Sequence, residues 1–262
     1  MKKTVALILA ATLLASVFLT GCGGKKEDKS LTKVKEAGVL VLGLDDSFPP
    51  MGFRDEDQNI VGFDIDVATE VCKRMGIELK TQPINWDTKD QELDTGNVDC
   101  IWNGYTYTEK KAKNQNLTDA YMKNTQTVVV LADSPINTVA DLSGKTVAVQ
   151  AGSTAEEVID GDADLKKSIG EIVPISDYVK AMMDLSIGGS DAVVMDEVVA
   201  RYYASKDPGK YKILEETLAD EEYVVAFRKN DQALRDEVQK QLTAIMEDGT
   251  MKTIAMKWFR CV

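Results

Sequence analysis

Histidine is absent from the 262 residues of the chain. Its absence excludes Ser-His-Asp and Cys-His nucleophile systems, His-ligated zinc and histidine acid–base catalysis. Basic residues are also in the minority, because 31 Lys and Arg stand against 43 Asp and Glu, for a net charge of −12. So acidic a chain repels phosphate backbones, and nucleic acid is not expected as a partner.

Long apolar runs are scarce as well. The run at residues 5–19 is too short for a membrane-spanning helix, which needs about 20 residues. Because Lys2 and Lys3 precede it and small residues follow it, it has the form of a secretory signal peptide. We therefore expect residues 1–21 to direct export and then to be removed.

The signal ends in Leu19-Thr20-Gly21-Cys22, which resembles the bacterial lipobox. The resemblance implies that Cys22 is lipidated, becomes the mature N-terminus and anchors the protein to the outside of the cell membrane. The alternative is an ordinary signal peptide with a chance cysteine. Residues 23–30 contain no apolar side chain, so we expect 22–30 to be a lipidated cysteine followed by a flexible tether.

Cysteine is also rare beyond the signal. Only Cys72, Cys100 and Cys261 follow Cys22. An odd number does not indicate a disulfide framework in an exported protein, and small buried hydrophobic side chains are the expected role. Whether any of the three forms a disulfide is left open.

Strand-length apolar segments alternate with amphipathic helical segments in the first part of the body. Residues 39–44 form a continuous apolar run, typical of a strand covered on both faces. A helix capped by Asp64 follows, then strands at 78–84 and 98–102 with a helix between them. This β-α-β-α-β order predicts a parallel sheet.

A second unit begins near residue 123 and repeats the alternation, with Ser176 expected to cap one of its helices. A last strand and two helices close the chain. The strands of the second unit are expected at 126–132, 145–150, 172–175, 191–195 and 211–214, and the closing elements at 223–227, 234–246 and 251–259.

Two motifs are rejected. Gly144-Lys145-Thr146 lacks the earlier glycine of a phosphate-binding loop, because Val139 stands there. Acidic residues at 160–171 follow calcium-loop spacing, but Leu165 replaces the glycine of the sharp turn. We expect solvated acidic turns there, with calcium not excluded, and no metal or other cofactor elsewhere.

Five motifs occur in order along the body: GVLVLG with DDSFPP at 38–50, GFDID at 62–66, DCIWNGYTYT at 99–108, GKTVAVQAGST at 144–154 and DAVVMD at 191–196. Together they resemble the solute-binding proteins of polar amino-acid ABC transporters, the bacterial extracellular solute-binding protein family 3. The resemblance extends from about residue 31 to the C-terminus.

The resemblance implies an α/β fold of the two-lobed, type II periplasmic-binding-protein kind. Two crossing hinge strands would join the lobes, and a ligand would bind between them. Lobe 1 would comprise 31–123 plus 222–262, and lobe 2 would comprise 124–221.

Polar residues follow the predicted strands at their carboxyl ends, where parallel sheets bind ligands. Asp45 follows strand 39–44 and Asp196 ends strand 191–195. The other polar residues at strand ends are Asn103 and Gly104, after 98–102, and Gly152, Ser153 and Thr154, after 145–150. Turn and cap chemistry is the alternative for each of them.

An amino acid needs donors for its carboxylate. Gly152, Ser153 and Thr154 open a helix, and we expect their free backbone N–H groups and the helix dipole to suit an anion. The hydroxyl groups of Thr106 and Thr108 are expected to add further donors.

The resemblance also places a basic residue, Lys111, on the carboxylate. The family usually has arginine there. Lysine keeps the charge but lacks the planar fork that makes two parallel hydrogen bonds. A neighbour such as Lys110, or a water molecule, would have to compensate; alternatively, both lysines are solvated.

The ammonium of the ligand needs acceptors. The resemblance gives this role to Asp196, and the carbonyl of Gly104 would add a second acceptor. Phe48 and Trp86 match the aromatic walls of the site, which suit an aliphatic stem, an amide or, by cation–π attraction, a guanidinium. Core packing is the alternative for both rings. Asp45 would then face the end of the side chain and favour amide or cationic amino acids.

The leading hypothesis is a monomeric, lipid-anchored receptor that captures a polar amino acid and presents it to ABC permease subunits. It is not an enzyme in this hypothesis and needs no cofactor. The alternatives are an exported enzyme on the same fold, such as a dehydratase, or a ligand-sensing domain.

Overall fold

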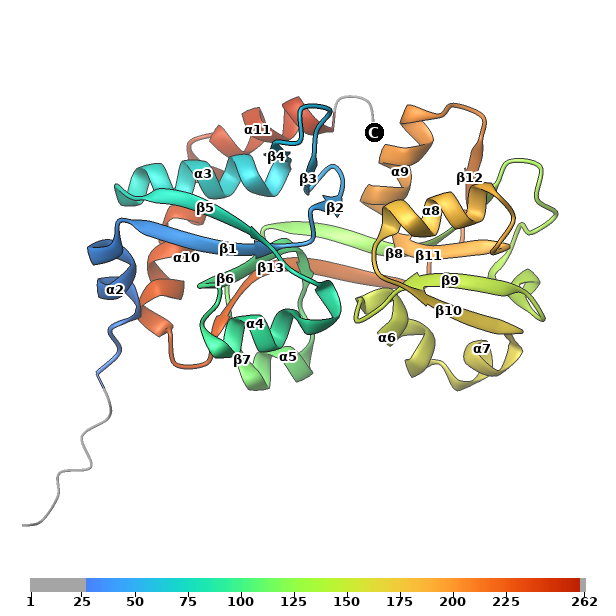
Figure 1. Ribbon diagram of the computed structural model, residues 1–262, viewed down its shortest axis with the longest axis horizontal. Helices are drawn as coiled ribbons and strands as arrows, with labels where there is room; N and C mark the ends of the chain where they lie inside the picture. Colours follow the sequence, from blue (N-terminus) through green and yellow to red (C-terminus); the bar gives the residue numbers. More distant parts are fainter. Residues whose placement is uncertain (1–26, 260–262) are drawn as a thin grey trace, which may run out of the picture.

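The computed structural model describes residues 27–259, and their helices and strands form two lobes side by side along the longest axis (Figure 1). Lobe 1, at the left of Figure 1, contains both ends of the described chain, and lobe 2 contains its middle. The predicted signal peptide at 1–21 lies outside the described residues, as do Cys22 and Cys261. Within residues 27–259, no helix combines the length and apolar character needed to cross a membrane.

Lobe 1 is built on a sheet in which β1 (Val39–Leu44) pairs in parallel with β5 (Glu78–Pro83) and β6 (Cys100–Thr106). The β-α-β order predicts this parallel pairing. The other elements of lobe 1 are α2 (Ser30–Ala37), β2 (Ser47–Phe48), β3 (Gly52–Arg54), β4 (Ile60–Val61), α3 (Phe63–Met75), the 3-10 turn Trp86–Thr88, α4 (Lys89–Thr95), α5 (Glu109–Asn114), β7 (Gln115–Leu117), α10 (Gln232–Glu247) and α11 (Thr250–Trp258).

Lobe 2 has the same design. Its central strand β9 (Thr146–Gln150) pairs in parallel with β10 (Glu171–Ile175) and β11 (Ala192–Asp196). Helices cover both faces of this sheet (Figure 1). The remaining elements are the 3-10 turn Val139–Leu142, α6 (Thr154–Gly161), α7 (Ala163–Ser168), α8 (Tyr178–Ser186), α9 (Glu197–Lys206) and β12 (Tyr211–Ile213).

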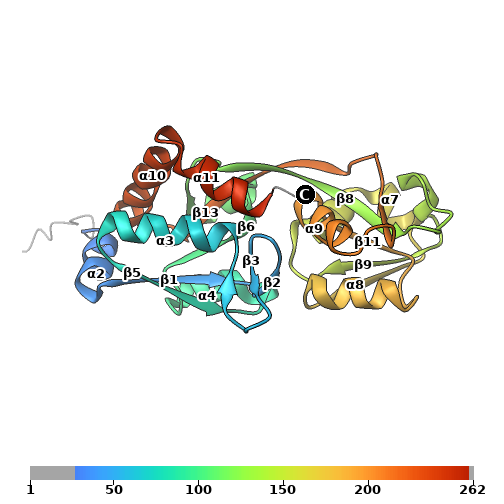
Figure 2. The same cartoon turned by 90° about the horizontal axis from the view of Figure 1, so that it is seen from above.

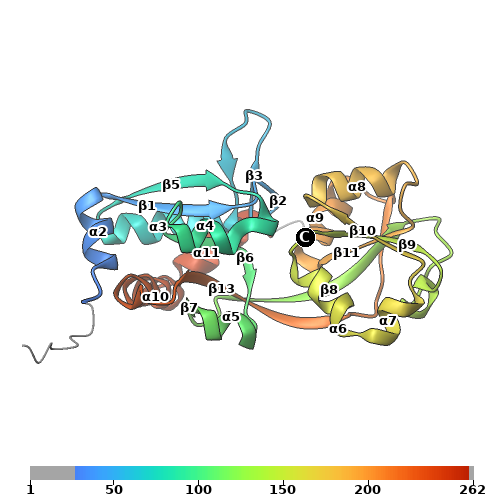
Figure 3. The same ribbon diagram turned by 60° about the horizontal axis from the view of Figure 1, so that its bottom comes forward.

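Two long strands, β8 (Met122–Leu131) and β13 (Ala219–Arg228), cross between the lobes (Figures 2 and 3). They pair antiparallel from Met122–Tyr223 to Gln126–Ala219. Beyond that segment β8 pairs with β11 of lobe 2, and β13 pairs with β6 of lobe 1. One sheet therefore runs through both lobes. The lobe boundaries predicted from the sequence fall inside the paired segment and stay a prediction.

Three local predictions are wrong. Helix α3 has no side-chain cap, because Asp64 is fully buried and its carboxylate accepts the N–H of Gly104 at 2.8 Å. Helix α8 is capped by Asp177 rather than Ser176. Strand β6 continues to Thr106, so Asn103 and Gly104 lie within the strand and not beyond its end. Every residue of β6 is buried, because helices cover both faces of the sheet, and this burial overrides the polar sequence.

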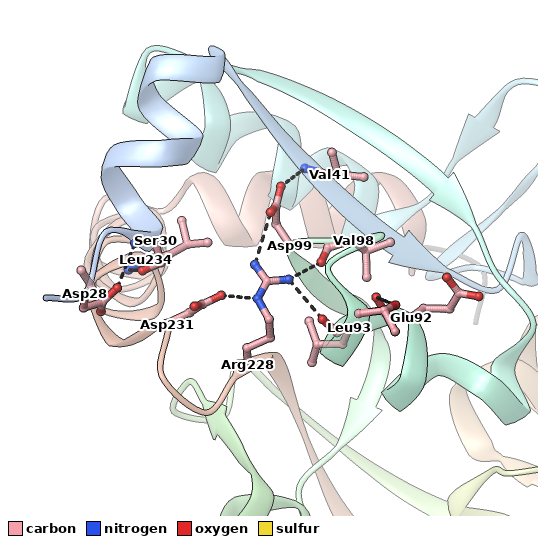
Figure 4. Close-up of polar contacts among 12 residues, drawn as sticks. Asp28, Ser30, Val41, Glu92, Leu93, Val98, Asp99, Arg228, Asp231 and Leu234 are labelled. Carbon is pink, nitrogen blue, oxygen red and sulfur yellow. Dashed lines mark hydrogen bonds and ion pairs between the residues drawn. The ribbon is translucent and has the colours of Figure 1, made fainter. Parts of the chain in front are cut away.

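The predicted tether also ends earlier than expected, because α2 begins at Ser30. The Asp28 carboxylate accepts the N–H of Ala233 at 2.6 Å, and the Ser30 hydroxyl oxygen accepts the N–H of Leu234 at 3.1 Å. These bonds join the start of the body to the first turn of α10 (Figure 4). Polar capping contacts thus hold residues that have no apolar side chain to pack.

Arg228, at the end of β13, joins three parts of lobe 1 (Figure 4). Its guanidinium donates to the carbonyls of Leu93 at 3.2 Å and Val98 at 2.6 Å. It also pairs with Asp99 at 3.4 Å and Asp231 at 2.7 Å. The returning C-terminal segment is therefore held against the segment between α4 and β6, which is distant in sequence.

The cysteines and the acidic turn have structural roles. Cys72 and Cys100 are free thiols buried in the core. In the stretch considered for calcium, Asp162 caps α7 and Asp160 pairs with Lys166 at 2.8 Å. Those carboxylates already have partners, and the described residues contain no cluster of acidic or cysteine ligands suited to a metal ion.

Candidate ligand-binding site

A small cavity lies between the lobes, near the paired segment of β8 and β13. It encloses about 290 Å³ of empty space, and the centre of a water molecule can range over about 10 Å³ of it. That is room for about one water. Both lobes line the cavity, with Phe48, Trp86, Lys89, Gly104, Thr106 and Lys111 from lobe 1 and Gln150, Gly152, Ser153, Thr154 and Asp196 from lobe 2.

The lobes are closed directly on one another around this cavity. The rings of Phe48 and Tyr178 lie 5.7 Å apart between centroids. Gln150 Nε2 donates to Asp45 at 2.6 Å, and Lys89 Nζ donates to the carbonyl of Gly152 at 2.7 Å. An amino-acid ligand needs far more than one water's volume, so the lobes must separate to admit it and then close around it with a larger cavity.

Most of the residues predicted for the site meet at this cavity. The exceptions are Asp45, Asn103 and Thr108, each of which has a local partner. Asp45 is buried, accepts the N–H of Ser47 and lies behind Gln150. Asn103 accepts the N–H of Asp45 at 3.1 Å, and Thr108 caps α5. These three side chains therefore support the walls and do not line the cavity.

Two of the backbone N–H groups predicted to face an anion at this helix terminus, those of Gly152 and Ser153, already have partners. The N–H of Gly152 donates to the carboxylate of Glu156 at 2.7 Å, and the N–H of Ser153 donates to the carbonyl of Gln150 at 3.2 Å. Glu156 sits in the first turn of α6 and reaches back to the terminus. Its negative charge neutralises the positive end of the helix dipole.

The ammonium of Lys111 borders the cavity, as predicted. It donates to the carbonyl of Thr106 at 2.9 Å and lies 4.4 Å from the ring centroid of Tyr105. Burial lowers the pKa of Lys111. Lys110, named as the neighbour that would compensate for the missing arginine, is exposed and does not line the cavity.

Asp196 ends β11 and is almost fully buried. Its Oδ1 accepts the Asn124 amide and the Tyr223 hydroxyl, both at 2.7 Å, whereas its Oδ2 accepts only a long bond of 3.5 Å from Tyr178. Oδ2 therefore has the capacity to accept a ligand donor. Burial, and then the nearby carboxylate of Glu221, raise the pKa of Asp196, so a cation beside it would favour its charged form.

Phe48 and Trp86 form aromatic walls, and both are almost fully buried. Phe48 lies against Gly104, where φ is +57° and an added Cβ would sit 2.7 Å from the Phe48 ring. The site thus needs glycine at 104 both for its backbone angle and for the close ring.

Sequence reasoning missed two residues of the cavity, Lys89 and Gln150. Lys89 lies in a polar, acidic stretch that reads as a solvated helix face, and its position three residues after Trp86 was the available signal. Gln150 is the last residue of β9. The strand-end rule that selected its neighbours applies equally to it.

A second hollow lies beside the hinge, and the centre of a water molecule can range over about 700 Å³ of it, against about 10 Å³ in the small cavity. Its lining residues include Tyr107, Lys123 and Glu197. It is open to solvent and contains none of the predicted site residues. The small cavity is therefore the better candidate for the binding site.

Two α/β lobes, two crossing strands and a polar cavity between the lobes define a two-lobed binding protein of the type II periplasmic class. The chain belongs to the bacterial extracellular solute-binding proteins, family 3, whose family model matches residues 40–260.

Named relatives agree with this assignment. The arginine-binding extracellular protein ArtP of Bacillus subtilis is 30% identical over 265 residues, covering 99% of this chain and 98% of the relative. The L-cystine-binding protein TcyJ of Escherichia coli is 27% identical, covering 96% and 93%. A solved ABC uptake transporter substrate-binding protein from Streptococcus pneumoniae with bound histidine has a TM-score of 0.86 and 33% identity, covering 90% of this chain and 97% of that one.

Proposed function

We propose that this protein captures a polar amino acid between its lobes and delivers it to the permease subunits of an ABC importer. The observation that carries the proposal is the placement of opposite charges on the two sides of one cavity. Lys89 and Lys111 border it from lobe 1, and Asp196 borders it from lobe 2. An α-amino acid carries one carboxylate and one ammonium, so it can pair with both sides only when the lobes are closed, and it favours that state.

The side-chain end of the site supports an amide or cationic amino acid. Gln150 uses its amide nitrogen on Asp45 at 2.6 Å and on the carbonyl of Ser176 at 3.3 Å. Its carbonyl oxygen remains as an acceptor for an N–H of the ligand. Asp45 thus acts through Gln150. The bound ligands named for the relatives, which include arginine and histidine, agree with a nitrogen-bearing side chain.

The test is to identify the ligand directly. The chain without its signal peptide, residues 23–262, is purified, and any co-purifying small molecule is released and identified by mass spectrometry. Calorimetric titration with arginine, lysine, histidine, glutamine and cystine then measures affinity. Binding of at least one of them, recovered chemically unchanged, is expected. Conversion of the ligand would instead favour the dehydratase alternative, and binding of none would refute the proposal.

The lipobox supports a further part of the proposal, that lipidated Cys22 holds the protein on the outer face of the membrane. Two acyl chains are enough for stable anchoring. Cys22→Ala should move the protein from the membrane fraction to the supernatant, whereas the buried Cys72→Ala should leave it in the membrane fraction. Retention of Cys22→Ala after a salt wash would contradict the anchor.

A further inference from the structure

Two ammonium groups, that of the buried Lys89 and that of the half-buried Lys111, share the cavity without a carboxylate partner. Lys89 is 6% exposed, and its Nζ donates to the carbonyls of Trp86 at 3.1 Å and Gly152 at 2.7 Å. Lys111 donates to the carbonyl of Thr106 at 2.9 Å. Within the part of the chain that the structure describes, neither ammonium forms an ion pair. Buried lysines are rare unless they are paired, so the lobe 1 side of this cavity suits an anion.

The hydrogen-bond capacity of the two side chains points the same way. An ammonium has three N–H donors. Lys89 uses two of them and Lys111 uses one, which leaves three donors between the two groups. At the terminus of α6, Glu156 accepts the N–H of Gly152. The lysines are therefore the charged donors available to a carboxylate.

We propose that Lys89 is a second carboxylate-binding residue, which with Lys111 forms a two-ammonium clamp on the α-carboxylate of the bound amino acid. This assignment rests on the function proposed above. A single arginine supplies two parallel N–H donors to a carboxylate, and a single lysine does not. The pair of lysines restores that number of donors from two separate helices, α4 and α5.

Lys89 also connects carboxylate binding to closure. It belongs to lobe 1, whereas its carbonyl partner at Gly152 belongs to lobe 2, 63 positions away in sequence. The bond to Gly152 exists only with the lobes together. The ammonium of Lys89 therefore contacts the opposite lobe and the ligand at the same time. A bound α-carboxylate holds this ammonium in place and so favours the closed state.

The test compares an acid with its amide in matched variants. Glutamine with glutaminamide, and arginine with argininamide, are titrated calorimetrically into the unchanged protein, Lys89→Met and the exposed-site control Lys110→Met. Loss of the bond to Gly152 should weaken binding of acid and amide alike, by less than about tenfold. Loss of the charged hydrogen bond to the carboxylate should weaken binding of the acid to Lys89→Met by about 10- to 100-fold more than binding of the amide.

A second arm uses the arginine fork. In a Lys111→Arg background, Lys89→Met should weaken binding of the acid by less than about fivefold more than binding of the amide, because arginine supplies both donors to the carboxylate. Equal weakening of acid and amide by Lys89→Met would assign Lys89 only to lobe closure and overturn the clamp. Unchanged affinity for the acid would overturn it as well.

Two further outcomes separate this inference from its foundation. A preference for glutamate over glutamine that Lys89→Met abolishes would place the clamp on the side chain of the ligand and overturn the α-carboxylate assignment. If the unchanged protein binds neither acid nor any other amino acid of the panel, the proposed function fails, and the clamp fails with it. If the unchanged protein binds an amino acid but Lys89→Met does not weaken the acid more than the amide, only the clamp is refuted and the proposed function is retained.

Discussion

Gly152→Ala should weaken closure of the lobes, whereas the matched variant Gly144→Ala should lower only the stability of the fold. Gly152 has φ +69°, and an added Cβ would lie 2.8 Å from Asp87 Cα and 2.9 Å from Asp87 Oδ1. Asp87 belongs to lobe 1 and Gly152 to lobe 2. The clash therefore arises only when the lobes meet. Gly144 is the matched control, because its φ is +71° and an added Cβ would have nothing within 4 Å.

The expected losses follow from the left-handed backbone at both glycines and from the contact with Asp87 at Gly152 alone. Both alanine variants hold a left-handed backbone, at a cost of about 1–2 kcal/mol in the free energy of unfolding. Only Gly152→Ala also overpacks the closed interface, at a cost of roughly 2 kcal/mol in the closing equilibrium. That cost reduces the binding-competent fraction, so the apparent Kd should rise about thirtyfold.

The assay has two readouts. Urea denaturation should show similar losses of stability in the two variants, and calorimetric titration with the identified amino acid should show weaker binding for Gly152→Ala alone. Small-angle scattering should also require more ligand to reduce the radius of gyration of Gly152→Ala. Equal affinities in Gly152→Ala and Gly144→Ala would refute the reasoning, because the bound protein would then not bring residue 152 against Asp87.

Three other outcomes are expected. Burial raises the pKa of Asp45 from 3.8 to about 6, so its protonated form contributes stability below pH 3.8 that is lost as the pH rises through 6. The unfolding free energy of Asp45→Asn minus that of the unchanged protein should therefore rise by roughly 2 kcal/mol between about pH 4 and pH 8. A difference that stays constant over this range in urea denaturation would contradict this. Arg228→Met should lose about 2 kcal/mol in the same measurement, because four partners lose a donor, whereas Arg201→Met, in an exposed pair, should lose under about 0.5 kcal/mol. Asp196→Ala should weaken ligand binding at least about 100-fold in calorimetry, and near-normal affinity would show that the ammonium site lies elsewhere.

The main elements could be predicted because the apolar pattern is strong where strands are covered on both faces. Residues 39–44 and 145–150 are examples, and the structure has β1 and β9 there. The small sheet of β2, β3 and β4 was missed, because Pro49 and Pro50 read as a loop. Its strands are two or three residues long and depend on packing rather than on local preference.

The strand-end rule identified some of the residues that line the cavity and missed others. Residues at strand ends, such as Gly152 and Asp196, could be found because a parallel sheet gathers them at one edge. Lys89 could not be found, since its burial depends on Gly152 coming from the other lobe. The partner of the Gly152 N–H was also missed, because nothing local indicates that Glu156 turns back to it.

The order of the strands in space has a consequence for how the protein is made. Strand β13 lies between β8 and β6 in the sheet, so one edge of β6 stays unpaired until residues 219–228 have been synthesised. The strands of lobe 2 come from a nearly continuous stretch and can pair before the end of the chain is available. Lobe 1 depends on contacts of high sequence separation, such as those of Arg228 with Leu93 and Val98, which form slowly. A chain that becomes available from its N-terminus can therefore pair the strands of lobe 2 while the sheet of lobe 1 still lacks β13, and it exposes an edge of β6 to aggregation until then.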